Sequence, residues 1–222
     1  MATAKKSTIP PTRFDDSVDD YVASHSTPAD ALLTELERST YVNYLRPHMV
    51  AGHIQGKVLE MLSCMMQPKR ILELGTFTGY SALCLAKGLA PDGELHTIDI
   101  NDELEDFTRS FFNRSPHASQ IHYHLGDARD IIPTLGGNFD MAFIDADKRE
   151  YPEYYELVFK SVRVGGFIIA DDVLWYGKVL TDTDAFTRAL QQFNDMVMAD
   201  SRVENVIFPI RDGLMVARKV CE

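Results

Sequence analysis

Residues 71–81, which read Ile-Leu-Glu-Leu-Gly-Thr-Phe-Thr-Gly-Tyr-Ser, constrain the fold of this chain more than any other segment. A short apolar run of the kind that forms a buried strand leads into a turn with glycines and then into a helix start. The carboxylate of Glu73 lies inside the apolar run, and burying a charge is costly unless it is paired or bound. Gly75 and Gly79 permit positive φ angles and a close approach of the backbone to a ligand. The segment therefore predicts a strand–turn–helix unit built around a ligand site.

Strand-like and helix-like stretches alternate through most of the remaining chain. Strands are predicted near 70–74, 94–99, 120–125, 140–145 and 165–170. Helices are predicted from the capping segment 26–30 toward residue 44, and near 52–66, 79–89, 102–114, 151–162 and 183–199. Such alternation is typical of an α/β fold whose parallel sheet carries helices on both faces. Two β-rich runs at 203–209 and 214–220 flank an Arg-Asp-Gly turn and predict a C-terminal hairpin.

Length and charge bound the architecture and the partners. The 222 residues suffice for one domain, which we expect to span 26–222 after an N-terminal arm at 1–25. A net charge of −11 argues against a surface built mainly for nucleic acid or anionic membrane. No apolar run approaches a membrane span and no signal peptide is evident, so a cytoplasmic location is expected. Cys64 and Cys84 lie in helical apolar patterns and are expected to be buried and unpaired.

A second acid stands at the end of the second predicted strand. Asp99 closes the apolar run 95–99, and nucleotide-binding α/β folds hold ribose hydroxyls at this position. The glycines do not follow the G-x-G-x-x-G spacing of dinucleotide sites, so the pattern suits a ligand with a ribose but no pyrophosphate, such as S-adenosylmethionine. After the third strand, Asp127 can accept from an adenine amino group, and the Ala128 amide can donate to a ring nitrogen. The alternative for Asp127 is a turn residue that only caps a helix.

Three more acids follow the next two strands. Asp145 ends one strand, and Asp171 and Asp172 end the other. Because neighbouring parallel strands end at the same edge of a sheet, we expect these carboxylates to lie together, where like charges repel unless a cation separates them. Hard oxygen ligands suit Mg²⁺, Mn²⁺ or Ca²⁺ rather than zinc. The alternative is a set of loop acids that cap helices.

Lys148, three residues past Asp145, is the candidate proton acceptor. A nearby cation favours the neutral form of a lysine, which can then take a proton from a hydroxyl held by the metal. The alternative is a solvated surface lysine. His122 and His124 share a face of one strand as a possible metal pair, but without an evident third ligand a half-exposed sheet position is the preferred interpretation.

Together these motifs resemble the cation-dependent class I O-methyltransferases, the family of catechol O-methyltransferase and the plant caffeoyl-CoA O-methyltransferases, and especially their small bacterial members. The resemblance extends over residues 28–220. The motifs that carry it are ILELGTFTGYSALCLA (71–86), LHTIDIN (95–101), GDA (126–128), FDMAFIDADKREYPEYYE (139–156), VRVGGFIIADDVLWYGKV (162–179) and RDGLMVARK (211–219).

The resemblance implies a Rossmann-like methyltransferase fold, with a seven-stranded, mostly parallel sheet and an antiparallel C-terminal edge hairpin, usually in a homodimer. It places the metal ligands on Asp145, Asp171 and Asp172 and the catalytic lysine on Lys148. With the residues singled out above, the candidate S-adenosylmethionine-binding set is Ala51, Glu73, Gly75, Thr76, Gly79, Ser81, Asp99, Asp127, Ala128 and Asp145.

Two positions depart from the family pattern. The third metal ligand is usually Asn, and here it is Asp172, so three carboxylates around a divalent cation leave one net negative charge. Tyr176 stands where the plant enzymes place a substrate-contacting Asn, so their acyl-CoA specificity is not carried over.

The function expected from these residues is methylation of one hydroxyl of a vicinal-diol, catechol-like aromatic small molecule. One alternative is O-methylation of hydroxyuridine in tRNA, served by a local basic patch of Lys5, Lys6, Arg13 and Arg46. A less expected alternative is a non-enzymatic module that binds the methyl donor as part of an interaction.

Overall fold

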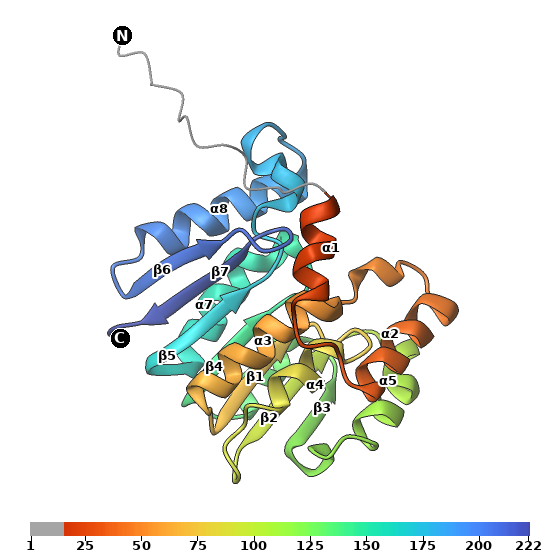
Figure 1. Cartoon of the computed structure of the whole chain (residues 1–222). Coiled ribbons are helices and arrows are strands. Elements are labelled where there is room, and N and C mark those ends of the chain that lie inside the picture. Colours follow the sequence, from red (N-terminus) through yellow and green to blue (C-terminus); the bar gives the residue numbers. More distant parts are fainter. Residues whose placement is uncertain (1–15) are drawn as a thin grey trace.

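The computed structural model describes residues 16–222, and its centre is one seven-stranded sheet in the order β3-β2-β1-β4-β5-β7-β6 (Figure 1). The strands are β1 (Arg70–Leu74), β2 (Glu94–Asp99), β3 (Ile121–Leu125), β4 (Phe139–Ile144), β5 (Val162–Ala170), β6 (Val203–Phe208) and β7 (Leu214–Lys219). Strands β1 to β5 pair in parallel, whereas β7 runs antiparallel to both β5 and β6. The predicted parallel sheet with an antiparallel C-terminal hairpin is therefore confirmed.

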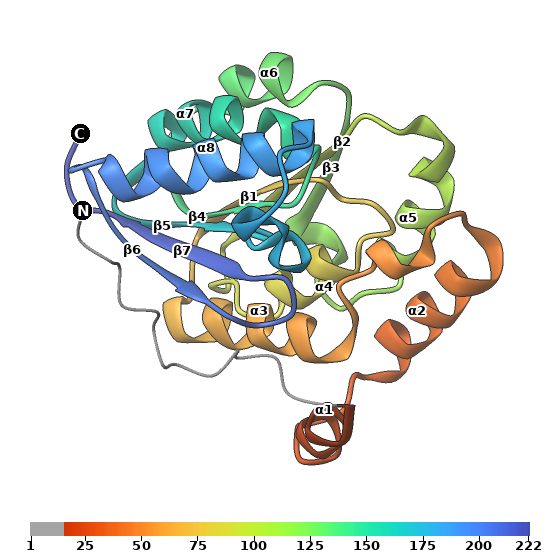
Figure 2. The same cartoon turned by 90° about the horizontal axis from the view of Figure 1, so that it is seen from above.

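Helices cover both faces of this sheet, as Figure 2 shows from above. α6 (Ala128–Ile131), α7 (Tyr151–Ser161) and α8 (Ala185–Ala199) lie on one side. The other side carries α2 (Ala31–Asn43), α3 (Gly52–Met66), α4 (Tyr80–Ala86) and α5 (Glu105–Phe112). Among residues 16–222, no helix combines the length and apolar character needed to cross a membrane.

The core consists of two apolar clusters, one for each face. Because side chains alternate along a strand, Leu72 of β1 packs with Tyr151 and Phe193 on the α7–α8 side. Its neighbour Ile71 packs with Leu59 on the α3–α4 side. Coverage of both faces explains why the central strands read as nearly continuous apolar runs.

The N-terminal elements differ most from expectation. α2 begins at Ala31 with Asp30 as its cap, whose side chain accepts from the Leu33 amide at 2.9 Å, so the predicted start at residue 26 is wrong. The cap is therefore the last residue of the segment 26–30, and the helix begins directly after it. Within the predicted arm, α1 (Asp16–Ser24) is a helix with mostly exposed side chains that stands apart from the sheet (Figure 2). Residues 1–15 lie outside the described part of the chain.

Smaller differences occur further along the chain. The helix predicted near 102–114 divides into a 3-10 turn, Asp102–Leu104, and α5, while the short helix α6 was not predicted. Cys84 is buried as expected, but Cys64 is exposed because it lies on the outer face of α3.

Candidate functional site

A cavity of about 990 Å³ opens at the carboxyl ends of the parallel strands. Five strand ends and the loops that follow them contribute to its wall, and the residues they supply include Gly75, Asp99, Asp127, Asp145 and Asp171. Ligands in open α/β sheets bind at this edge. The cavity therefore brings together acids that lie far apart in the sequence, such as Asp99 and Asp171, which are 72 residues apart (171 − 99).

Backbone hydrogen bonds continue the parallel ladder one residue beyond the strand ends. The amide of Gly75 donates to Ile98, and the amide of Asp145 donates to Leu74, at 2.9 and 2.8 Å. The amide of Asp171 donates to Ile144 at 3.0 Å. These bonds fix where each loop leaves the sheet, so the acids that follow β4 and β5 start from neighbouring backbone positions.

Asp99 lines the cavity at the end of β2, where the sequence predicted it. Its Oδ2 accepts from the Phe77 amide at 2.7 Å and its Oδ1 accepts from the Asn101 amide at 2.9 Å. Burial raises the pKa of this carboxyl, against the backbone amides that stabilise its charged form. The backbone amides therefore hold the carboxylate rigidly at the wall of the cavity.

Glu73 lies behind the cavity wall and has no exposed surface. Its Oε2 accepts from Thr97 at 2.5 Å, and the Thr97 hydroxyl also contacts that of Thr76 at 2.5 Å. Burial raises the pKa of Glu73 to about 8, although the hydroxyls of Ser81 and Thr97 oppose the shift. Its Oε1 has no hydrogen-bond partner of normal geometry among the described residues, so one buried acceptor is left for a donor from outside.

The two glycines of the first turn serve packing as well as backbone conformation. Both have positive φ, 96° at Gly75 and 90° at Gly79, as expected. A Cβ at Gly75 would come within 2.0 Å of the Asp145 carbonyl oxygen, and one at Gly79 within 2.5 Å of the Phe112 ring. Gly75 lines the cavity and Gly79 does not. The missing side chains therefore let the turn pack against β4 and α5, and only Gly75 is placed to contact a ligand.

Asp127 caps α6 and is partly committed to a neighbour. Its Oδ1 accepts from the amide of Arg129, whose Nε and Nη2 bind the same carboxylate at 2.9 and 2.6 Å. The hydrogen bonds of Arg129 lower the pKa of Asp127. Both Asp127 and Ala128 line the cavity. The same turn can therefore cap α6 and present its groups to an adenine ring, so the two interpretations of Asp127 do not exclude each other.

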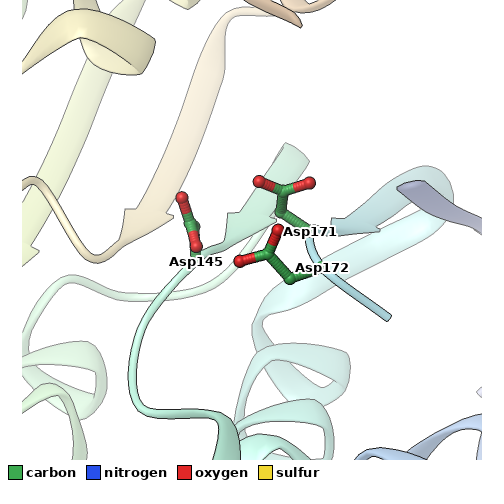
Figure 3. Close-up of side chains that lie close together, drawn as sticks. All are labelled: Asp145, Asp171 and Asp172. Carbon is green, nitrogen blue, oxygen red and sulfur yellow. The ribbon is translucent and has the colours of Figure 1, made fainter. Parts of the chain in front are cut away.

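Three carboxylates gather where β4 and β5 end (Figure 3). One ligand oxygen from each of Asp145, Asp171 and Asp172 lies within 4.8 Å of the others. Asp172 has a φ of 58°, in the left-handed region that Asn and Asp tolerate better than most residues. Burial, followed by repulsion from Asp145 and Asp172, raises the pKa of Asp171 to about 8. A divalent cation would offset that repulsion, so this oxygen-only donor set fits Mg²⁺, Mn²⁺ or Ca²⁺.

Lys148 is buried beside these acids. Its Nζ lies 2.6 Å from Asp145 Oδ1 and 3.1 Å from Asp172 Oδ2. Burial disfavours the ammonium, but the carboxylates outweigh it and hold the pKa of Lys148 well above its usual value. The surface-lysine alternative is therefore wrong, since only 7% of the residue is exposed. The predicted neutral form of Lys148 applies to a site in which a cation is bound beside it.

Tyr151 holds Lys148 from the opposite side and was not identified from the sequence. Its hydroxyl accepts from Lys148 Nζ at 2.7 Å and lies 3.0 Å from the carbonyl oxygen of Asp171. The side chain has no exposed surface. The one sequence signal was its spacing, because Lys148 and Tyr151 are three residues apart and share a helical face.

The mouth of the cavity is apolar and aromatic. Trp175, Tyr176 and Phe186 line it, with the Trp175 and Phe186 rings stacked at 6.0 Å. Leu45 and Met49 line it as well. Trp175 is thus part of the cavity wall, although a single tryptophan in a sequence is usually a packing residue. The other four come from a loop, from short 3-10 segments and from the start of α8, where periodicity carries no information about function.

The remaining candidates lie outside the cavity wall. Ala51 precedes α3 and its carbonyl accepts from Arg211, while Ser81 lies in α4 on the Glu73 side. His124 contacts His96 at 3.0 Å, and the cluster they form with His122 contains no group of three ligand atoms spaced for a metal. The preferred interpretation as a partly exposed sheet position is consistent with the 45% exposure of the His122 side chain.

Comparison with known proteins gives one consistent result. The model of the O-methyltransferase family matches residues 23–220. A caffeoyl-CoA O-methyltransferase of Populus kitakamiensis is 34% identical over 180 residues, which cover 75% of this chain and 77% of the relative. A catechol O-methyltransferase of Niastella koreensis is 36% identical over 174 residues, covering 73% and 79% of the two chains.

Solved structures agree with the sequence relatives. The O-methyltransferase TomG from Streptomyces achromogenes, in complex with S-adenosylmethionine, superposes with a TM-score of 0.85 at 31% identity and covers 92% of this chain and 96% of its own. An O-methyltransferase from Bacillus cereus, in complex with S-adenosylhomocysteine, gives a TM-score of 0.80 at 29% identity, with coverage of 91% and 97%.

Proposed function

This chain belongs to the O-methyltransferase family, and on that premise we propose that it methylates one hydroxyl of a catechol-like aromatic molecule in a reaction that requires a divalent cation. The observation that carries the proposal is a single cavity with two acidic centres. Asp99 lies at one centre, and Asp145, Asp171 and Asp172 lie at the other. A methyl donor and a metal-chelating acceptor would thereby share one chamber.

The chain's own residues divide the work of binding. Asp99 would hold the ribose of S-adenosylmethionine, and buried Glu73 would support, through the Thr97 hydroxyl, the turn at Gly75 and Thr76 that would contact the methionine end. Asp145, Asp171 and Asp172 would hold the cation. When bound, S-adenosylmethionine supplies an electrophilic methyl group and the cation lowers the pKa of a chelated hydroxyl.

Lys148 and its neighbours would manage the proton. The Nζ atom lies between Asp145 and the Tyr151 hydroxyl, so its position is fixed before a substrate arrives. From there it would receive or orient the proton of the acceptor hydroxyl. Holding both partners in one enclosed chamber would supply the in-line approach that methyl transfer needs.

The mouth of the cavity supports an aromatic acceptor. Trp175, Tyr176 and Phe186 offer flat apolar surfaces on which a catechol ring can pack. No observation favours the tRNA alternative, because Lys5, Lys6 and Arg13 of the expected basic patch lie outside the described residues. The family assignment argues against a non-enzymatic module.

We also propose a cytoplasmic homodimer, as the family resemblance implies. Exposed apolar side chains on α3, Met61 at 51% and Met65 at 75%, give one surface on which copies could associate. Light scattering behind a sizing column measures the mass directly, and a mass near 25.0 kDa would contradict the dimer.

The decisive experiment is a methyl-transfer assay with Mg²⁺ or Mn²⁺ against a panel of catechols, together with unmodified and hydroxylated tRNA. We expect methylated products from catechols only, identified by mass spectrometry. Transfer to hydroxylated tRNA with none to catechols would overturn the proposed acceptor class.

A further inference from the structure

Two residues outside the acidic cluster connect it to the loop before α3. The side-chain amide of Gln55 donates to Asp171 Oδ2. The carbonyl oxygen of the same side chain accepts from Arg211 Nη1 at 2.7 Å. Gln55 is only 2% exposed, so water cannot replace either partner.

Backbone carbonyl groups also hold the side chain of Arg211 in place. Its Nη1 also donates to the carbonyl oxygens of Val50, at 3.3 Å, and Ala51. Arg211 lies in the β6–β7 connection with a φ of 49°, so the hairpin brings a residue from the end of the chain to the start of α3. The contacts form a relay that runs from the segment Val50–Ala51 through Arg211 and Gln55 to Asp171.

This relay fixes the orientation of a buried amide. An Asn or Gln side chain has an oxygen and a nitrogen of similar shape, and its partners decide which way it points. Arg211 can only donate and therefore selects the Gln55 orientation that turns the NH₂ group toward Asp171. The Asp171 oxygen that accepts from Gln55 is thereby held in place. This contact fixes the plane of the carboxylate, so the direction of its other oxygen is fixed as well.

We propose that Gln55 and Arg211 are positioning residues that hold Asp171 in its metal-binding orientation and tie it to the segment Val50–Ala51. The inference rests on the proposed function, because it assigns to Asp171 the role of a metal ligand. Partners of this kind around metal ligands typically change metal affinity by about 10–100-fold when removed.

The test is a titration of the full-length protein with Mn²⁺, followed by the electron paramagnetic resonance signal of the free ion. Gln55→Leu keeps a similar side-chain volume and should weaken Mn²⁺ binding by about 10–100-fold. Gln120→Leu is the matched control. The side-chain amide of Gln120 is also hydrogen-bonded, in its case to the backbone carbonyls of Ala90 and Gly93, but Gln120 lies outside the cavity wall, so its loss should leave Mn²⁺ affinity unchanged.

Arg211→Asn separates positioning from simple charge and keeps a residue type suited to positive φ. Removing a cation near a metal site should tighten Mn²⁺ binding if charge alone matters, whereas loss of the relay should weaken it. Arg211→Lys, which keeps a donor for Gln55, should restore part of the affinity.

Three results would overturn the inference. Unchanged affinity in a folded Gln55→Leu variant would remove Gln55 from the relay, and tighter binding in Arg211→Asn would leave Arg211 with a charge effect only. A parent protein that binds no Mn²⁺ would refute the metal requirement of the proposed function itself, and the inference with it.

Discussion

Asp172 is the residue at which the family resemblance leads us to expect Asn instead of Asp. The side chain lies 3.1 Å from Lys148, and its left-handed backbone suits Asn as well as Asp. We expect Asp172→Asn to keep the ligand geometry but weaken metal affinity about tenfold or more, ~1.4 kcal/mol, because one charge is lost. The same change should move the alkaline rise of the rate to lower pH, since a negative neighbour raises the pKa of the acceptor hydroxyl.

Asp172→Ala completes this series because it removes the ligand oxygen. Both metal affinity and rate should fall below those of Asp172→Asn. Metal titration and a pH–rate profile on the parent and both variants give the comparison. If Asp172→Ala binds metal as tightly as the parent and keeps its profile, Asp172 is not a ligand.

Asp99 carries the second prediction at this scale. Asp99→Ala should weaken S-adenosylmethionine binding by about 1.5–3 kcal/mol, because a charged acceptor for the ribose is lost. Isothermal calorimetry measures this directly. Asp92→Ala is a suitable control, since Asp92 is largely exposed and, within residues 16–222, pairs only with Lys69, at 3.5 Å, away from the cavity. Equal affinity in Asp99→Ala and the parent would place the ribose elsewhere.

At the scale of elements, the sheet edge formed by β2 and β3 should be sensitive to acid. His96 and His124 are 3.0 Å apart, with His122 on the same face. Burial lowers the pKa of His96, opposed by Glu94 and reinforced by His122 and Arg70. Burial, His96, His122 and Arg109 lower that of His124. Because the folded pKa values lie below the unfolded value of about 6.5, the unfolded chain binds more protons, and stability is lost as pH falls below that value.

His124→Gln tests this expectation while keeping a polar side chain on the strand. Urea unfolding at pH 7.5 and pH 5.5 should show a smaller loss of stability in His124→Gln than in the parent. His25→Gln removes a histidine outside the sheet, so it shows whether the loss of any one histidine has the same effect on stability. The same loss in all three proteins would show that β2 and β3 do not titrate in this way.

Elements that a local sequence pattern specifies could be predicted, whereas those that tertiary contacts select could not. The apolar strands and their terminal acids were located to within a residue or two, except the start of β5 at Val162, because burial on both faces imposes continuous apolar runs. The start of α2 was misplaced because Ser26, Thr27 and Asp30 are all competent caps and only tertiary packing selects one. Gln55 and Arg211 are 156 residues apart, so their contact follows from the hairpin's position, which no local pattern specifies.

At the scale of the whole molecule, the strand order separates the two halves of the site. β1, β2 and β3 lie on one side of the sheet's centre and carry Asp99 and Asp127, whereas β4 and β5 carry the three metal-ligand candidates. Both groups face one cavity because all five strands are parallel. The topology therefore predicts that donor binding and metal binding can be removed independently.

Excess chelator should abolish methyl transfer to a catechol while leaving S-adenosylmethionine affinity within a few-fold of its value in Mg²⁺. Asp99 is held by the backbone amides of Phe77 and Asn101, so its position does not depend on the acidic cluster. The donor should also raise the melting temperature in chelator, since a ligand at 100 times its Kd stabilises the native state by about 2.7 kcal/mol. Calorimetry, a thermal melt and a product assay on one preparation, with activity restored by added Mn²⁺, distinguish the outcomes. Full activity in chelator would refute the metal requirement, and loss of donor binding there would show that the two halves of the site are coupled.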